Sequence, residues 1–557
     1  MSNATEAIRT ARDQLLGWRG QGDVARREFV WPEIRGKFNW AIDWFDAIGR
    51  DRDDLALWIK DEDGTDDRYS YGDLVTRSDR LAHWLSAQGV GKGDTVMLML
   101  GNQIELWDTM LAAMKVGAVI LPTAQALQHY DLEDRIPRAD VRVVVANPED
   151  EAKFDAVEGL VFITTGPAHG RWLSMTAADD APATPREVVT DVDDPVLYYF
   201  TSGTTKDPKL VVHTQLSYPV GHLSTMYFIG VRPGDVHLNI SSPGWGKHAW
   251  SSFFSPWLAE AAVFSFNYTR FDAATMLQEL EASQVTTFCA PPTVWRMMIQ
   301  ANLGEKPSAL REIVGAGEPL NPEVIKTVEN AWGLTIRDGY GQTETTCSIG
   351  NAPGERVKPG SMGKFLPGMD VTIIDPDTGE ESNTGEVTLG LDPWPYNLMS
   401  GYIGGAPTAQ ADGRYHSGDL VTVDAEGYVT YVGRTDDVFK ASDYKISPFE
   451  LESVLIEHAA VVEAAIVPSP DPIRAAVPKA YVKLAEGYSP DAATALSILL
   501  YAKQRLAPYL RVRRVEFADL PKTISGKVRR VVLRARELES GVEIVDFRYE
   551  QFTELRG

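Results

Sequence analysis

Hydrophobic and polar positions in the first third of the chain alternate between the spacing typical of helices and the spacing typical of strands. In Tyr69–Leu85 the leucines recur on one face of a helix, and Ser70 followed by Asp73 is typical of a helix start. Short apolar runs bounded by turn residues predict buried strands. The expected strands lie at 95–100, 116–121 and 141–146, with a second helix at 105–115. Strands that alternate with helices in this way predict an α/β sheet.

The central part of the chain predicts further strands and then a domain boundary. These strands are expected at 285–290, 371–374, 385–389 and 427–432, and Gly- and Pro-containing turns separate the last three. The last three strands suggest a β-rich subdomain. The polar stretch 433–437 follows the last of these strands, and we place the boundary there. We therefore expect a large N-terminal domain, residues 1–435, that consists of β-sheets flanked by helices.

The C-terminal part predicts a small α+β domain, residues 436–557. Ser447-Pro448-Phe449-Glu450 combines a helix N-cap, a first-turn proline and an acidic residue three positions after the cap. Strands are expected at 464–467 and 480–484, with a helix at 492–506. These elements make a unit of about the usual domain size.

Composition limits the partners that the chain can have. The chain has 557 residues, 44% hydrophobic content and a formal net charge of −24, so it lacks the broad basic surface that nucleic acids or anionic membranes require. Its two cysteines show no metal-ligand spacing, and we expect neither a zinc site nor a disulfide. Charged residues interrupt both the N-terminal segment and the apolar run Leu98–Leu121. We expect a cytoplasmic protein without a membrane span, either a monomer or a homodimer.

A polar loop between two apolar runs carries the first candidate chemistry. Tyr198–Phe200 and Leu210–Val212 read as strands, and the residues between them offer hydroxyl groups, ammonium groups and backbone N–H groups to an anion such as triphosphate. The candidate phosphate contacts are Thr201, Ser202, Gly203, Thr204, Thr205 and Lys209. The loop fits neither stock phosphate motif, and a polar hairpin without a ligand is the alternative.

Five segments in one order resemble the acyl-adenylate-forming superfamily, which comprises acyl-CoA synthetases, peptide-synthetase adenylation domains and luciferases. They are Thr201–Lys209, Gly315–Leu320, Asp338-Gly339-Tyr340-Gly341-Gln342-Thr343-Glu344, Tyr415-His416-Ser417-Gly418-Asp419, and 433–452 together with Pro521-Lys522-Thr523-Ile524-Ser525-Gly526-Lys527. The resemblance covers most of the chain and is strongest to the medium-chain and aromatic acyl-CoA synthetases. It implies that the C-terminal domain is a lid that rotates between two half-reactions.

The resemblance also implies roles for individual residues. Lys527 would bridge the carboxylate and the α-phosphate as a fixed cation, Glu344 would hold Mg²⁺, and Thr343 would donate to the phosphates. Tyr340 would stack on adenine, and Asp419 would accept hydrogen bonds from the ribose hydroxyls. Further nucleotide contacts implied are Gly317, Glu318, Pro319, Asp338, Gly339, Gln342, Arg434 and Lys445. The alternatives are a surface lysine, a helix start at Thr343 and Glu344, a core aromatic at Tyr340 and an Asx turn at Asp419.

The acyl pocket and the lid hinge are predicted in the same way. Gly341 stands where acetate-specific relatives carry Trp, which argues for a longer or aromatic acid. Trp245 or His248 would supply a wall of this pocket, with simple core packing as the alternative. Asp436 matches the hinge of the lid.

The chain departs from the family pattern at two places. Lys206 replaces a usual Gly in the phosphate loop, which restricts the backbone and adds positive charge. Asp443 replaces a Gly that many relatives carry beside Ser442 at the thiol tunnel, and Lys445 stands where Arg is common. A carboxylate at this tunnel puts the thioester step in more doubt than adenylation.

The function predicted is an acid–CoA ligase that uses ATP, Mg²⁺ and coenzyme A. A carboxylic acid and ATP would give acyl-AMP and pyrophosphate, and CoA would then displace AMP. One alternative is an adenylating ligase that passes the acyl group to a carrier protein or an amine. Another is a non-catalytic nucleotide-binding relative, which Lys527, Glu344 and the hydroxyl loop disfavour.

Overall fold

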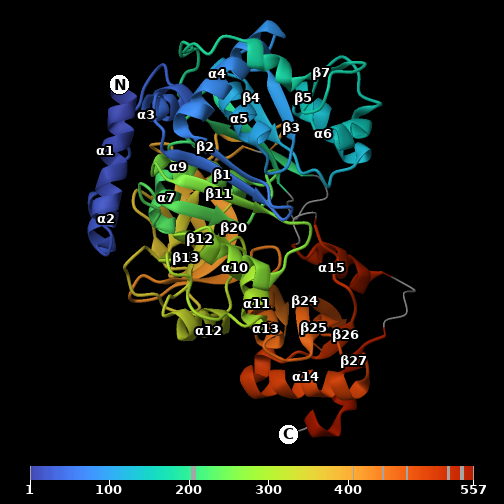
Figure 1. The fold of residues 1–557 in the computed structure, drawn as a ribbon. Helices are drawn as coiled ribbons and strands as arrows, with labels where there is room; N and C mark the ends of the chain where they lie inside the picture. Colours follow the sequence, from blue (N-terminus) through green and yellow to red (C-terminus); the bar gives the residue numbers. More distant parts are fainter. Residues whose placement is uncertain are drawn as a thin grey trace.

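The computed structural model describes residues 2–201, 208–405, 407–441, 444–471, 474–523, 527–539 and 545–555, and these residues form two lobes (Figure 1). The larger lobe holds two large sheets and one small sheet. The smaller lobe, drawn in orange and red, holds the C-terminal sheet with α13 (Pro448–Ile456), α14 (Ala492–Arg505) and α15 (Arg530–Leu538). This arrangement agrees with the predicted fold class.

An eight-stranded sheet forms the upper part of the larger lobe (Figure 1). Its strands, in spatial order, are β19 (Gly401–Ile403), β9 (Lys209–Thr214), β8 (Pro195–Thr201), β4 (Val119–Pro122), β3 (Thr95–Met99), β5 (Val141–Ala146), β6 (Val161–Thr164) and β7 (Trp172–Ser174). The six strands from β8 to β7 run parallel, β9 is antiparallel to β8, and β19 is antiparallel to β9. β8 and β9 pair with Thr201 opposite Lys209, so the predicted strand–loop–strand is a hairpin.

A nine-stranded sheet lies next to it. In spatial order its strands are β16 (Lys364–Phe365), β15 (Cys347–Gly350), β14 (Arg337–Gly341), β13 (Glu312–Ala316), β12 (Thr287–Ala290), β10 (Val236–Asn239), β11 (Ala262–Asn267), β1 (Leu55–Asp61) and β2 (Asp66–Ser70). The strands from β14 to β1 are parallel, so their carboxyl ends meet at one edge. Ligands bind at such edges in open α/β sheets.

Helices cover the faces of these sheets. Those of the larger lobe are α1 (Asn3–Gly17), α2 (Gly22–Glu28), α3 (Ala47–Gly49), α4 (Tyr71–Ala87), α5 (Ile104–Val116), α6 (His129–Arg138), α7 (Leu223–Ile229), α8 (Gly246–Ala249), α9 (Ser255–Leu258), α10 (Ala273–Ala282), α11 (Pro292–Gln300) and α12 (Pro322–Trp332). α4 begins with the predicted capping box of Ser70 and Asp73. The strand predicted from residue 116 begins only at Val119, because α5 runs on until Gly117 adopts a left-handed conformation.

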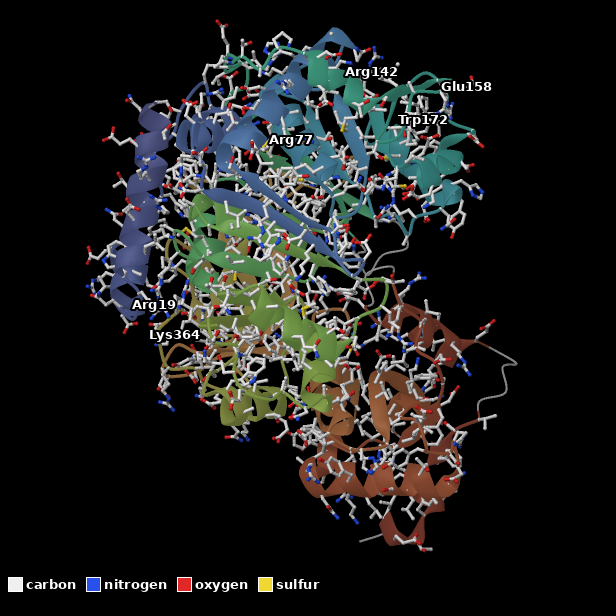
Figure 2. All side chains as sticks on the ribbon, in the orientation of Figure 1. Arg19, Arg77, Arg142, Glu158, Trp172 and Lys364 are labelled. Carbon is white, nitrogen blue, oxygen red and sulfur yellow. The ribbon has the colours of Figure 1, made fainter. Side chains whose placement is uncertain are left out.

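Buried ion pairs tie these helices together. The fully buried Lys115 of α5 lies 2.8 Å from Asp46 and 2.7 Å from Asp79. Arg77 of α4, labelled in Figure 2, lies 2.7 Å from the buried Asp108 of α5. These ion pairs offset the cost of burying the charged residues of the apolar run around α5, which packs inside the lobe. No helix in the described residues is long and apolar enough to cross a membrane.

Two small sheets lead from the larger lobe to the smaller lobe. The first contains β17 (Val371–Ile374), β18 (Thr384–Gly390), β20 (Arg414–Val423) and β21 (Val429–Arg434), all antiparallel, as the predicted β-rich subdomain requires. After β21 come the short pair β22 (Phe439–Ala441) and β23 (Tyr444–Ile446). The sheet of the smaller lobe contains β24 (Val461–Asp471), β25 (Ala475–Leu484), β26 (Arg514–Phe517) and β27 (Phe547–Arg548). The boundary between residues 435 and 436 stays a prediction.

Candidate active site

A cavity of about 1320 Å³ lies between the two lobes. The larger lobe contributes the end of β14 and the turn that follows it, together with β20 and β21, and the smaller lobe contributes α13 and α15. The cavity gathers many of the residues that the sequence singles out. They are Thr201, Lys209, Gly317, Glu318, Pro319, Asp338, Gly339, Tyr340, Gly341, Gln342, Thr343, Glu344, Asp419, Arg434 and Lys527.

Asp419 is the centre of a hydrogen-bond network on one wall of this cavity. Its Oδ2 accepts from Tyr340 Oη at 2.7 Å and from Gln342 Nε2, and its Oδ1 accepts from Tyr431 Oη at 3.2 Å. Arg434 Nη1 lies 3.4 Å from Oδ2. Burial and the charge of Asp419 raise the pKa of Tyr340 well above its usual range, so Tyr340 remains a donor. A carboxylate offers about four acceptor positions, so these contacts leave Oδ1 with capacity for one further donor.

The turn after β14 presents Thr343 and Glu344 to the cavity. The buried His213 donates from Nε2 to the carbonyl oxygen of Thr343 at 2.7 Å, and the N–H of Met399 donates to the carbonyl oxygen of Glu344 at 2.8 Å. The side chain of Glu344 accepts a hydrogen bond from Tyr402 Oη on β19 at 2.9 Å. Lys209 Nζ in turn lies 4.9 Å from the centre of the Tyr402 ring. The side chains of Thr343 and Glu344 therefore project from a backbone that these hydrogen bonds hold in place.

The donor set at Glu344 fits Mg²⁺ that arrives with a nucleotide. No group of three or more His, Cys, Asp or Glu residues among the described residues could hold a metal ion by itself. Mg²⁺ usually binds to one or two carboxylates, to waters and to the phosphates of its substrate. Glu344 provides one carboxylate in the cavity that Thr201 and Thr343 also line.

The turns after β13 and β14 bring small residues to the cavity. Gly317 has φ +110°, a conformation that favours glycine, and a Cβ at Gly339 would lie 2.4 Å from the ring of Phe228. The side chain of Asp338 is buried beside them and accepts from the N–H groups of Leu320 and Gly339. Burial nevertheless raises the pKa of Asp338 to about 7.

The raised pKa of Asp338 predicts a pH-dependent stability. The folded protein keeps the proton that the unfolded chain releases near pH 4, so the stabilising contribution is largest below pH 4 and is lost as pH rises to about 7. We expect Asp338→Asn to gain about 2–3 kcal/mol of unfolding free energy relative to the wild type between pH 5 and pH 7. Urea unfolding of both proteins across this range measures the difference. A constant difference would contradict the buried, protonated carboxyl group.

The smaller lobe presents Lys527 to the cavity. The carbonyl oxygen of Lys527 accepts a hydrogen bond from the N–H of Thr523 at 2.8 Å, and the residue is exposed. Arg530 and Arg534 of α15 both pair with Asp437, next to the predicted hinge. Asp436 itself lies 3.6 Å from Arg434. These ion pairs join the smaller lobe to the end of β21.

Several predicted site residues lie elsewhere. Lys445 Nζ is 2.6 Å from Asp377 at the surface, and neither residue lines the cavity. His248 is buried, and its Nε2 lies 2.9 Å from Asn102 Oδ1, while burial lowers the pKa of His248 to about 3. Trp245 is the N-cap residue of α8 and also does not line the cavity. The predicted roles of Ser202, Gly203, Thr204, Thr205, Ser442 and Asp443 fall on residues outside those that the structure describes.

Sequence reasoning missed Trp250 and Tyr402. A Cβ at Gly341 would meet the Cη2 atom of Trp250 and the carbonyl oxygen of Thr346, each at 2.3 Å. The indole of Trp250 therefore occupies space next to Gly341, and its Nε1 donates to Tyr218 Oη at 2.6 Å. No local pattern marks either residue, because each contacts the site from a distant segment.

Comparisons with known proteins identify the family. The model of the AMP-binding enzyme family matches residues 45–403, and the model of the AMP-binding enzyme C-terminal domain matches residues 450–527. The chain belongs to the AMP-binding enzyme family. The family, fold class and enzyme class predicted from the sequence are thereby confirmed.

Individual relatives span almost the whole chain. A 4-hydroxybutyrate–CoA ligase 1 of Metallosphaera sedula is 42% identical over 515 residues, which cover 90% of this chain and 91% of the relative. The mitochondrial acyl-coenzyme A synthetase ACSM3 of Mus musculus is 36% identical over 91% of each chain. A solved structure, the anthranilate CoA ligase AuaEII in complex with anthranoyl-AMP, superimposes with a TM-score of 0.81 at 26% identity, over 90% of this chain and 98% of the other.

Proposed function

We propose that the chain is an ATP-dependent, AMP-forming acid–CoA ligase for a medium-chain or aromatic acid. The observation that carries this proposal is that Tyr340, Glu344, Asp419 and Lys527, which come from distant parts of the chain, line one cavity. Membership of the AMP-binding enzyme family and the names of the relatives support the same reaction.

In the first half-reaction, the substrate carboxylate attacks the α-phosphorus of ATP, the bond to the bridging oxygen of the β-phosphate breaks, and pyrophosphate leaves. Two anions must approach each other, so the protein acts mainly by alignment and by charge neutralisation. Tyr340 would pack against adenine, and Asp419, with Arg434, would contact the ribose. Lys527 would neutralise charge between the carboxylate and the α-phosphate.

Mg²⁺, when bound, would neutralise the phosphate oxygens and aid departure of pyrophosphate. Glu344 would be its carboxylate ligand in the protein. Thr343 would donate its hydroxyl to the phosphates, and Lys209 would add positive charge at the mouth of the hairpin.

In the second half-reaction, the thiol of CoA attacks the acyl carbonyl and AMP leaves. We propose that the C-terminal domain, residues 436–557, turns about Asp436 between the two steps, so that Lys527 serves only the first. The thiol-tunnel role of Ser442 and Asp443 and the nucleotide contact of Lys445 are part of this proposal. We place the protein in the cytoplasm.

An acid panel tests the proposed function. Protein, ATP and Mg²⁺ are mixed with acetate, butyrate, 4-hydroxybutyrate, hexanoate, octanoate, benzoate or anthranilate, and ATP–pyrophosphate exchange is followed. Exchange with a longer or aromatic acid but little with acetate is expected. CoA is then added and the thioester is sought by mass spectrometry. Exchange without thioester would favour a carrier protein or an amine as acceptor, and no exchange with any acid would overturn the proposal.

Tyr402→Phe tests whether Tyr402 positions Glu344. The Tyr402 hydroxyl donates a hydrogen bond to Glu344 Oε1. Burial and the negative charge of Glu344 raise the pKa of Tyr402, so its hydroxyl stays protonated. We expect about a tenfold slower pyrophosphate exchange and a higher Mg²⁺ concentration at half-maximal rate, since one hydrogen bond to a charged group is lost. Tyr396→Phe is the control, because Tyr396 stacks on Trp31 and has no contact with Glu344. An unchanged Mg²⁺ dependence would contradict this positioning role.

A further inference from the structure

Two arginines of α15 bind the residue that follows the proposed hinge. Arg530 and Arg534 are four positions apart, so they lie on one face of the helix. Arg530 Nη1 lies 3.5 Å from Asp437 Oδ2, and Arg534 Nη1 donates to Asp437 Oδ1. Asp437 is buried, and it comes directly after Asp436 in the chain. Figure 1 shows α15 on the side of the smaller lobe that faces the larger lobe.

Glu452 of α13 binds Arg530 from a second side. Arg530 donates from Nε to Glu452 Oε1 at 3.0 Å and from Nη2 to Glu452 Oε2 at 2.5 Å, which is a bidentate pair. The buried carboxylate of Glu452 also accepts from the N–H of Ile466 on β24 at 2.7 Å. Burial acts to lower the pKa of Arg530, but the charges of Glu452 and Asp437 outweigh it and raise this pKa, so the guanidinium stays charged. The cluster therefore links the hinge, α13, α15 and β24.

Other contacts already anchor the second half of α15 in the smaller lobe. Leu533 packs in an apolar cluster with residues of β24 and β25. Glu537 is buried, accepts from Lys479 Nζ at 2.7 Å and also accepts from Tyr481 Oη. Buried ion pairs contribute little net stability, because removing the charges from water costs about as much as their attraction returns. The charges at the first half of α15 therefore serve mainly to fix its direction relative to the hinge.

The start of α15 leads directly to Lys527. Only two residues separate Lys527 from Arg530, the first residue of the helix. The N–H of Arg529 between them donates to the carbonyl oxygen of Pro521 at 2.8 Å, which holds this connection in place. Lys527 and Asp437 line the same cavity. A change of direction at the hinge therefore reaches Lys527 through the side chain of Asp437 and α15.

We propose that Asp437 is a positioning residue for Lys527: by holding Arg530 and Arg534, it ties α15 to the backbone beside the hinge and so aims the ammonium group at the α-phosphate. This inference rests on the proposed acid–CoA ligase function. Asp437 touches no substrate in this assignment and acts only through α15. Displacing a reacting group by about 1 Å can slow a reaction about 100-fold, so the direction of α15 decides how well Lys527 works.

Asp437→Asn tests the proposal, because Asn keeps the size of the side chain and removes the charge that both arginines bind. ATP–pyrophosphate exchange is measured with the acid of the panel that the wild type uses best. We expect kcat to fall about 10- to 100-fold and KM for ATP to change less than about twofold. Conversion of the corresponding acyl-AMP and CoA to thioester is expected to change less than about threefold, because Lys527 serves only the first step. Asp519→Asn is the control, since Asp519 forms an exposed ion pair with Lys483 in the same lobe.

A double variant separates positioning from folding. If Asp437 acts only through Lys527, adding Asp437→Asn to Lys527→Ala is expected to slow exchange no further, because the group being aimed is already gone. A general loss of structure would instead multiply the two effects and would slow thioester formation as well. Arg534→Gln removes only one of the two partners of Asp437 and is measured beside it, so that the same split between half-reactions is tested even if Asp437→Asn does not fold. Thermal unfolding shows which variants are folded.

Three outcomes in folded variants would overturn this assignment. They are equal slowing of both half-reactions, exchange that stays at the wild-type rate, and a double variant in which the two losses multiply. Each of them leaves a wild type that still exchanges pyrophosphate. Absence of exchange by the wild type with every acid would instead refute the ligase function itself.

Discussion

Lys527→Ala is expected to slow acyl-adenylate formation by about three orders of magnitude and to leave the conversion of supplied acyl-AMP and CoA to thioester largely intact. A single cation about 4 Å from an anion contributes roughly 4 kcal/mol at an effective dielectric constant near 20, which corresponds to this factor. Lys527 is exposed at the cavity, so it reaches this strength only when substrates exclude water around it. ATP–pyrophosphate exchange reports the first step, and mass spectrometry of the thioester reports the second.

Lys522→Ala is the matched control for this prediction. Lys522 pairs in an antiparallel bridge with Val528, next to Lys527, and lines the same cavity, but its Nζ is held 2.6 Å from Glu463. We expect Lys522→Ala to change the rate of pyrophosphate exchange less than threefold, as is usual when an exposed ion pair is removed. If Lys527→Ala slowed both half-reactions equally, a lid that presents different faces in the two steps would be untenable.

Local signals in the sequence predicted most elements around the site. The capping box of Ser70 and Asp73 starts α4, Ser447 caps α13 through the N–H of Glu450, and the apolar runs that end at Thr201 and resume at Lys209 form the antiparallel pair β8 and β9. Each depends on residues a few positions apart. Elements with such short-range determinants can be read from one sequence.

Contacts between distant segments could not be predicted in this way. Tyr402 and Glu344 are 58 positions apart, and Trp250 packs on Gly341 across the lobe. Gly341 predicts room for a longer acid when read alone, but the indole of Trp250 fills part of that room. The fold also buries the Nζ atom of Lys247, which its place in the sequence does not indicate. The shape of the space next to Gly341 therefore depends on packing that no motif encodes.

Glu344→Gln is expected to lower the rate of pyrophosphate exchange about 100- to 1000-fold at a fixed Mg²⁺ concentration. Glutamine keeps the size of the side chain and can still accept from Tyr402, so the change removes mainly the negative charge that would bind the metal. Loss of one electrostatic contact at a reacting phosphate typically costs about two to three orders of magnitude. Raising the Mg²⁺ concentration is expected to restore part of the rate, which a titration of exchange against Mg²⁺ measures.

Glu386→Gln separates this effect from a general change of charge in the cavity. Glu386 lines the same cavity, but its carboxylate is already held 2.8 Å from His416 and accepts from the N–H of Gly418 at 2.7 Å. Its removal should leave the Mg²⁺ dependence unchanged, because no free carboxylate oxygen faces the phosphates there. If both variants shifted the Mg²⁺ titration equally, the metal would respond to the summed field of the cavity, and Glu344 would lose its assignment as the ligand.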